Sequence, residues 1–259
     1  MSERLLIGVD VGTSAVKAAI YTPSGVPVAE ASEPLDIRHV APGVVEQEQE
    51  DFVRAAAKTV AGALRASDTD PARIAAIGFS SQMAGIGSVD EDFRPATRYD
   101  SWLDMRCQPY IEEMARDHAR EITALSGCPP TCAHAAKMLW WQHERPQEHR
   151  RIARFLTPSA YVAGHLAGLR GDEAYLDYTF LHFTGCSDAK AGTWSDVLCD
   201  RLGLDTSKLP EIVEPWRVIG ETKEDRVRGF GLPAGVPIVA GAGDTAAAAL
   251  GAGLVAPGM

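Results

Sequence analysis

The sequence predicts a mixed α/β domain, because strand-like segments open the chain in close succession and helical segments follow them. Apolar runs lie at residues 5–11, 15–21 and 26–31, separated by turn signals at 12–14 (Gly-Thr-Ser) and 23–25 (Pro-Ser-Gly). We therefore expect a mixed sheet that opens with three hairpin-connected strands. The chain has 259 residues, 46% of them hydrophobic and 23% charged, which is enough for one large core.

A helix and a buried strand are expected next. Apolar residues recur at helical spacing through residues 50–64, and residues 74–79 form a short apolar run. The middle of the chain is predicted to be mostly helical, over 110–125, 133–143 and 158–166, with proline near the helix boundaries. We expect these helices to flank the sheet.

The last third of the chain carries a capped helix and a strand that leads into a second helix. Ser195 is the predicted N-cap of a helix that ends at Gly203. A short apolar strand is expected at 236–240, followed by a tight turn at 241–243 (Gly-Ala-Gly) and an alanine-rich helix over 244–250.

Charge and hydropathy exclude several classes of partner. A formal net charge of −10 disfavours binding to nucleic acid. No run of eighteen apolar residues is present to span a bilayer, and the first residues lead into a strand rather than a signal peptide. We expect a cytoplasmic protein without a membrane partner. A homodimer is compatible with the sequence, which does not define an oligomeric state.

The five cysteines are odd in number and irregularly spaced, which favours reduced thiols over a disulfide framework. Cys128, Cys132 and His134 lie close together in the sequence, but no second ligand pair stands at a zinc-site spacing. We interpret this cluster as a turn followed by a helix rather than as a metal site.

The first motif with chemical potential lies at 10–17 (Asp-Val-Gly-Thr-Ser-Ala-Val-Lys), between the first two predicted strands. A glycine followed by two hydroxyl residues lets backbone amides approach a phosphate closely. Asp10, at the end of a strand, can hold magnesium, usually through water. The alternative is a plain hairpin in which Asp10 accepts hydrogen bonds from the turn. The position within a unit of three strands favours the phosphate site.

The second motif lies at 241–246 (Gly-Ala-Gly-Asp-Thr-Ala), where a strand passes through glycines into a helix. The helix N-terminus favours developing negative charge, and Asp244 stands there ready to accept a proton. The alternative is that Asp244 merely caps the helix. A dinucleotide-binding fingerprint would require a following βαβ unit, which the chain does not provide.

Two segments between these motifs are candidates for binding a small polar molecule. Residues 80–85 follow the strand at 74–79, where α/β folds place ligands. Trp102, Asp104 and Arg106 would share one side of an extended segment. Sugars suit such a surface, because their C–H faces pack on an indole ring and their hydroxyls hydrogen-bond to charged groups. The alternatives are a core tryptophan and a surface salt bridge.

Together these motifs resemble the FGGY carbohydrate kinases, and more closely their xylulokinase branch. The resemblance covers essentially the whole chain, at 7–14, 82–83, 102–106, 136–140 and 241–251. It implies an actin-like ATPase fold, which is ribonuclease H-like and has two domains. In that fold the first domain binds most of the sugar and the second most of the nucleotide.

The resemblance also implies phosphoryl transfer from ATP, with Mg²⁺, to a hydroxyl of a small sugar or polyol, and we expect a ketopentose such as xylulose. Asp244 resembles the family's catalytic base, and Asp10 resembles the acid close to magnesium. The phosphate-facing hairpin would be formed by Gly12, Thr13 and Ser14. The sugar pocket would be lined by Gln82, Met83, Ala84, Trp102, Asp104 and Arg106.

Three departures from the family pattern concern the substrate. Ala84 stands where xylulokinases usually have histidine, which removes a hydrogen-bonding partner and enlarges the pocket. Thr245 stands where asparagine is common, and residues 177–183 carry more aromatic bulk than the branch leads us to expect. All three point to a sugar or polyol other than D-xylulose.

The chain is about half as long as members of this family. We therefore expect residues 1–259 to form the N-terminal domain, which binds sugar and carries the catalytic base, with the C-terminal nucleotide-binding domain absent from this chain. Two alternatives remain open. One is a sugar-binding half without turnover on its own, and the other is an ATPase of the actin-like superfold with no sugar acceptor.

Overall fold

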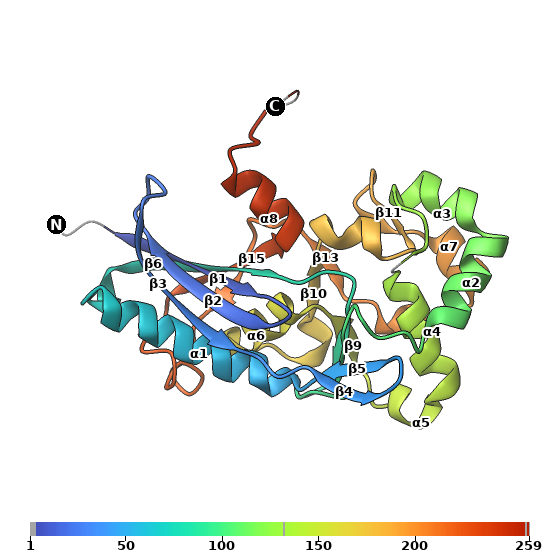
Figure 1. The fold of residues 1–259 in the computed structure, drawn as a ribbon, viewed down its shortest axis with the longest axis horizontal. Helices are drawn as coiled ribbons and strands as arrows, with labels where there is room; N and C mark the ends of the chain where they lie inside the picture. Colours follow the sequence, from blue (N-terminus) through green and yellow to red (C-terminus); the bar gives the residue numbers. More distant parts are fainter. Residues whose placement is uncertain (1–3, 132, 257, 259) are drawn as a thin grey trace.

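The computed structural model describes residues 4–131, 133–256 and 258, and it confirms a mixed sheet flanked by helices (Figure 1). The main sheet has the strand order β14-β15-β6-β1-β2-β3. The strands β1, β6 and β15 are parallel neighbours, whereas the other pairs are antiparallel. The bounds of these strands are β1 Leu5–Val11, β2 Ala15–Tyr21, β3 Pro27–Pro34, β6 Ile74–Ser81, β14 Val218–Glu221 and β15 Pro237–Gly243.

Smaller strands and helices surround the main sheet. The smaller sheets are formed by β4 (Arg38–Ala41), β5 (Val44–Gln47) and β8 (Tyr99–Asp100), by β7 (Gly87–Val89) and β9 (Arg154–Leu156), by β10 (Tyr175–Asp177) and β13 (Glu211–Val213), and by β11 (Ser187–Asp188) and β12 (Thr193–Trp194). The α-helices are α1 Gln49–Ala66, α2 Gln108–Asp117, α3 Ala119–Ser126, α4 His134–Glu144, α5 Pro146–His149, α6 Pro158–Ala167, α7 Asp196–Leu202 and α8 Asp244–Gly251. Short 3₁₀ turns are η1 Pro71–Arg73, η2 Gly171–Glu173, η3 Tyr178–Phe183 and η4 Thr206–Lys208.

The two faces of the main sheet differ because side chains alternate along each strand. In β1, Ile7, Val9 and Val11 are buried in the core with the helices α1 and α6, which cover this face. Gly8 and Asp10 lie on the opposite face, where α8 stands over only part of the sheet (Figure 1). One face is therefore core, and the other stays open beside the strand ends.

A second hydrophobic cluster lies beside the sheet, where Figure 1 shows α2, α3, α4, α5 and α7 grouped together. Trp140 and Trp141 on α4 pack edge to face, with ring centroids 5.0 Å apart. The predicted helix over 110–125 is wrong as a single helix, because His118 leaves helical conformation at φ −134° and separates α2 from α3. Neither glycine nor proline marks this break, so no local signal predicts it.

Local signals placed most of the other elements correctly. Ser195 caps α7, since its hydroxyl accepts a hydrogen bond from the Leu198 amide at 3.3 Å, and Gly203 follows the helix at φ +61°. The predicted tight turn at 241–243 is wrong: β15 continues through these residues and α8 follows directly. A bulge at Gly241 (φ +88°) keeps the chain extended while the register with β6 shifts.

Cys132, one member of the cysteine cluster, lies outside the described residues. Among the residues that are described, Cys107, Cys128, Cys186 and Cys199 are free thiols. No described helix is both long and apolar enough to cross a membrane.

The bulge at Gly241 leads to a stability prediction. A β-carbon on Gly241 would lie 1.7 Å from the Phe79 carbonyl oxygen, so Gly241→Ala should destabilise the fold by more than about 4 kcal/mol in urea unfolding. Gly235→Ala is the matched control, because Gly235 also has positive φ (+84°) but open space around it, and about 1–2 kcal/mol is expected there. Equal losses in the two variants would show that the close approach is unimportant.

Candidate active site

The candidate site is built on the carboxyl ends of three parallel strands. Asp10 on β1 and Ala242 on β15 both pair with Ser80 on the central strand β6. Asp10 and the start of α8 at Asp244 therefore stand at the same end of the sheet, where β1 and β15 lie about 10 Å apart on either side of β6. In open α/β sheets this edge is where ligands bind.

The hairpin between β1 and β2 is held by the buried amide of Gln82. The Gln82 carbonyl oxygen accepts a hydrogen bond from the Thr13 hydroxyl at 3.0 Å. Its NH₂ group donates to the side-chain oxygen of Gln47 at 3.1 Å and to the Gly12 carbonyl at 3.4 Å. The structure thus gives Gln82 a bracing role, and its contact with sugar stays a prediction.

Trp102 is bonded to the same hairpin. Its indole N–H donates to the Thr13 hydroxyl at 3.0 Å, while 47% of the residue remains exposed. The alternative of a core tryptophan is therefore wrong. An exposed indole ring with a fixed edge provides a flat surface on which a sugar face can pack.

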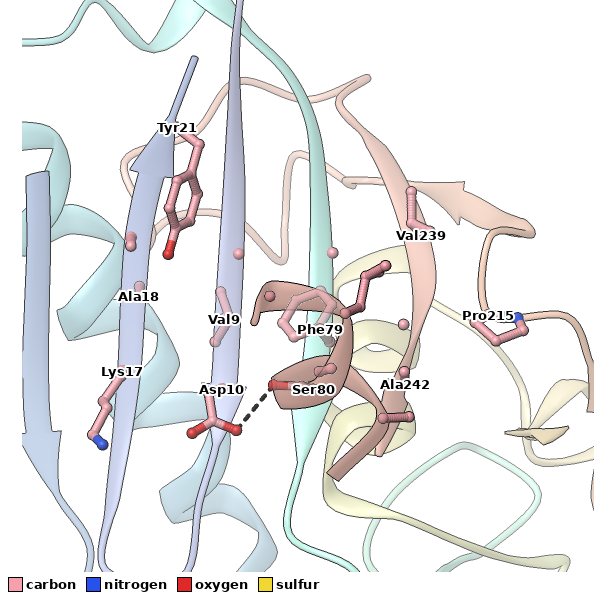
Figure 2. A pocket seen from close by; sticks show the side chains of 18 of the residues that line it. Val9, Asp10, Lys17, Ala18, Tyr21, Phe79, Ser80, Pro215, Val239 and Ala242 are labelled. Atoms are coloured by element: carbon pink, nitrogen blue, oxygen red, sulfur yellow. Dashed lines mark hydrogen bonds between the residues drawn. The ribbon is translucent and has the colours of Figure 1, made fainter. Parts of the chain in front are cut away.

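Asp10 lies on the open face of the sheet, at the mouth of a large hollow (Figure 2). Its carboxylate accepts a hydrogen bond from the Ser80 hydroxyl at 2.9 Å, across two adjacent strands rather than from the turn. Lys17 is the strand partner of Asp10 and is exposed on the same face. A half-exposed carboxylate is a hard oxygen ligand that suits Mg²⁺ through water, so the residues present fit that ion.

The hollow has a volume of about 1330 Å³ and runs from Asp10 along the sheet towards α8 and Trp216. This exceeds the roughly 300–1,000 Å³ of ordinary ligand pockets, so it is an open face rather than an enclosed cavity. Tyr178 and Trp216 meet edge to face at its rim, with ring centroids 5.8 Å apart. Asp10 and Lys17 on β1 and β2 therefore share this space with α8.

Asp244 is the first residue of α8, and its side chain is exposed. The N-cap position is held by Gly243, so the alternative in which Asp244 serves as the cap is wrong. The described hydrogen bond to its carboxylate comes from the neighbouring Thr245 hydroxyl at 3.2 Å. An exposed carboxylate at a helix N-terminus can accept a proton from a bound hydroxyl.

Met83 and Ala84 follow β6 beside the start of α8. A β-carbon on Gly243 would lie 2.7 Å from the Met83 methyl carbon, so Met83 packs directly on the residue before Asp244. Ala84 has φ +60°, a conformation that non-glycine residues seldom adopt. Such strained residues gather at binding sites, and this one stands in a segment predicted to contact sugar.

Asp104 and Arg106 form part of a buried ionic network instead of an open surface. The Arg106 guanidinium contacts Asp104 at 3.0 Å, Asp100 at 2.7 Å and Glu46 at 2.9 Å, and it lies over the Trp140 ring. The alternative of a surface salt bridge is wrong, since the Arg106 side chain is only 16% exposed. The shared side predicted for Trp102 and Asp104 is also wrong, because the segment is a turn that buries Asp104.

This network holds the loop that presents Trp102. Lys137 on α4 is buried and donates to the carbonyl oxygens of Ser101 at 3.0 Å and Asp104 at 3.1 Å. The carboxylate of Asp100 accepts from the Trp141 indole at 2.6 Å. Burial raises the pKa of Asp100 to about 6, against the opposing effect of Lys137 and Arg106.

The structure brings Asp10, the 12–14 hairpin, Met83, Trp102 and Asp244 to one edge of the sheet, while Gln82, Asp104 and Arg106 lie behind it as supports. Ser14 is exposed at the hairpin tip. Sequence reasoning gave no role to Lys17 or Thr179. The predicted hairpin at 12–14 could have paired Lys17 with Asp10 on the same face, but no local signal connects Thr179 with Gly243, 64 residues away.

Comparison with known proteins gives consistent matches. Residues 5–251 match the N-terminal domain of the FGGY family of carbohydrate kinases. The chain is 29% identical over 98% of its length to the xylulose kinase of Bacillus subtilis, and 30% identical over 97% to that of Escherichia coli. It covers 50% of each of these relatives, so it spans about half their length. The crystal structure of xylulose kinase from Rhodospirillum rubrum superposes with a TM-score of 0.89 at 25% identity, over 98% of this chain and 52% of that one.

The buried Asp100 predicts a pH dependence of stability. Its pKa is raised from an ordinary value near 4 to about 6, so its stabilising contribution is complete below pH 4 and is lost as the pH rises through 6. Relative to Asp100→Asn, the wild-type free energy of unfolding should therefore fall by about 1–3 kcal/mol between pH 4.5 and 7.5. Urea unfolding at several pH values measures this. The exposed Asp172→Asn control should run parallel to the wild type, and a parallel course for Asp100→Asn as well would contradict the assignment.

Proposed function

Because the chain belongs to the FGGY family of carbohydrate kinases, we propose that it forms the sugar-binding, base-bearing half of a kinase that transfers phosphate from ATP to a hydroxyl of a small sugar or polyol. The observation that carries this proposal is the placement of two carboxylates at one sheet edge. Asp10 lies beside the phosphate-facing hairpin, and Asp244 opens α8 across the central strand.

The two carboxylates have different surroundings, which suit different tasks. Asp244 is exposed at a helix start, where it would orient the acceptor hydroxyl and take its proton as the new O–P bond forms. Asp10 would hold the nucleotide's Mg²⁺ through water, and that ion supplies charge neutralisation at the phosphates when bound.

The hairpin would steady the transferred phosphate through the backbone amides other than that of Gly12, whose N–H is used within the turn. Gly12 closes a tight turn, since its N–H donates to the Ala15 carbonyl at 3.1 Å and a β-carbon there would lie 3.0 Å from the same oxygen. Lys17 adds a positive charge on the same face. Phosphoryl transfer depends mainly on positioning and charge stabilisation, which such a hairpin provides.

For the acceptor, we propose a ketopentose or a related polyol, bound between the exposed Trp102 ring, Met83 and Ala84. Alanine at position 84 leaves more room than a histidine would, which favours a substrate other than D-xylulose. The fixed indole argues against an ATPase with no sugar acceptor, because such an enzyme has no use for an exposed aromatic wall beside the phosphate hairpin.

The adenine and the closing wall of the cleft would come from the second half of a two-domain kinase. The open hollow is too wide to exclude water by itself. Closure of a second body over the sheet face would provide that exclusion and complete the site.

Asp244→Asn in the full-length protein should greatly slow phosphoryl transfer while leaving sugar binding intact. The catalytic rate should fall by at least about 10²-fold, because the general base is lost while the shape is retained. The sugar Kd should change little, and so should the melting temperature, since the side chain is exposed and is not the helix cap. Single-turnover phosphoryl transfer and calorimetry measure these quantities.

The matched control is Asp196→Asn, which removes an exposed first-turn carboxylate from α7. It should leave the catalytic rate unchanged. Near-normal transfer by Asp244→Asn would exclude Asp244 as the base.

Ala84→His in the full-length protein should shift the substrate ranking towards xylulose-like ketoses. Histidine adds bulk and a hydrogen-bonding group, and it is among the non-glycine side chains that tolerate positive φ. Relative kcat/KM values over a panel of ketoses, aldoses and polyols test this. Ala84→Gly, which relieves the backbone strain without narrowing the pocket, should keep the wild-type ranking. An unchanged ranking in Ala84→His would show that this residue does not face the sugar.

A further inference from the structure

A short chain of hydrogen bonds connects η3 with the start of α8. The Thr179 hydroxyl donates to the Asp177 carboxylate at 2.5 Å, and it accepts a hydrogen bond from the Gly243 backbone N–H at 2.8 Å. Asp177 also accepts from the Thr179 backbone N–H at 3.0 Å. The chain of hydrogen bonds ends at the backbone of Gly243, the residue directly before Asp244.

The direction of these bonds is set by the chemistry of the groups. A hydroxyl has one proton and two lone pairs, so donation to Asp177 turns a lone pair of Thr179 towards Gly243. The bond to a carboxylate is charge-assisted and stronger than a neutral one. Asp177 itself is buried and caps η3, which leaves it little freedom to move.

The Gly243 N–H lies at the point where β15 ends and α8 begins, and the hydrogen bond described for it goes to the Thr179 hydroxyl. The register between β15 and β6 shifts between Val239 and Ala242, and pairing resumes with Gly243 opposite Ser81. On its other side Gly243 meets Met83, whose methyl carbon would lie 2.7 Å from an added β-carbon. The N-cap of α8 is thus held between the Thr179 hydroxyl and the Met83 thioether.

We propose that Thr179 is a positioning residue, which fixes the N-terminus of α8 and thereby aims the Asp244 carboxylate at the acceptor hydroxyl. This rests on the proposed function for the role of Asp244. Thr179 also lines the hollow. One side chain of η3 therefore contacts both this space and the residue before Asp244. Removing the hydroxyl leaves the Gly243 N–H without this acceptor and frees the first turn of α8.

The test uses three variants of the full-length protein. Thr179→Val keeps the shape but removes both hydrogen bonds, Thr179→Ser keeps the hydroxyl, and Thr193→Val is a control at an exposed threonine on β12. Thr179→Val should lower the single-turnover rate by about 10- to 100-fold, as misplacement of a catalytic group by about 1 Å does. The sugar Kd should change less than threefold. Thr179→Ser and Thr193→Val should keep near wild-type rates.

A double mutant shows whether Thr179 acts through the base. In the Asp244→Asn background Thr179→Val should cause no further loss, because the group that it positions is already gone. An equal loss in both backgrounds would overturn the proposal, and so would a normal rate in Thr179→Val. If Thr179→Val does not fold, as judged by its melting curve, Thr179→Ala takes its place with the same expected outcomes.

Amide hydrogen exchange separates this proposal from the proposed function. The Gly243 amide should exchange at least about tenfold faster in Thr179→Val than in the wild type or Thr179→Ser, whatever the substrate is. Faster exchange in a protein that phosphorylates no sugar in the panel would refute the kinase assignment of Asp244 and with it the role in catalysis. Unchanged exchange would refute the positioning role directly, even in an active kinase.

Discussion

The pairing of β6 with parallel strands on both sides is the constraint on which the rest of the structure depends. Ser80 is in register with Asp10 on β1 and with Ala242 on β15. This register places two segments, more than 230 residues apart in the sequence, at one edge of the sheet. A slip of one residue in either pair would turn the affected side chains to the opposite face and destroy the arrangement.

The sequence predicts well those features whose signals are local. Alternating and helical apolar patterns located the three opening strands and the helices α1, α4, α6, α7 and α8 to within a few residues. The two glycine-containing motifs also marked both ends of the candidate site. In these segments the local conformational preference agrees with the tertiary structure, so the neighbouring residues are sufficient to predict the secondary structure.

Features that depend on distant partners could not be predicted in this way. The pairing of Arg106 with Glu46 joins segments 60 residues apart, and no local pattern distinguishes this buried network from a surface ion pair. The extension of β15 through its glycines depends on the Pro215 and Arg217 carbonyls, which accept hydrogen bonds from the bulged chain. The break at His118 has no compositional marker, so a continuous helical pattern was the natural interpretation.

The Thr13 hydroxyl is shared by two parts of the site, since it donates to Gln82 and accepts from Trp102. The Trp102 indole therefore cannot swing aside without releasing a bond at the tip of the hairpin between β1 and β2. A molecule that immobilises the indole also stiffens the hairpin, and one that grips the hairpin stiffens the wall. By thermodynamic reciprocity, two ligands bound at the indole and at the hairpin would change each other's affinity by the same factor, and a single hydroxyl would couple them.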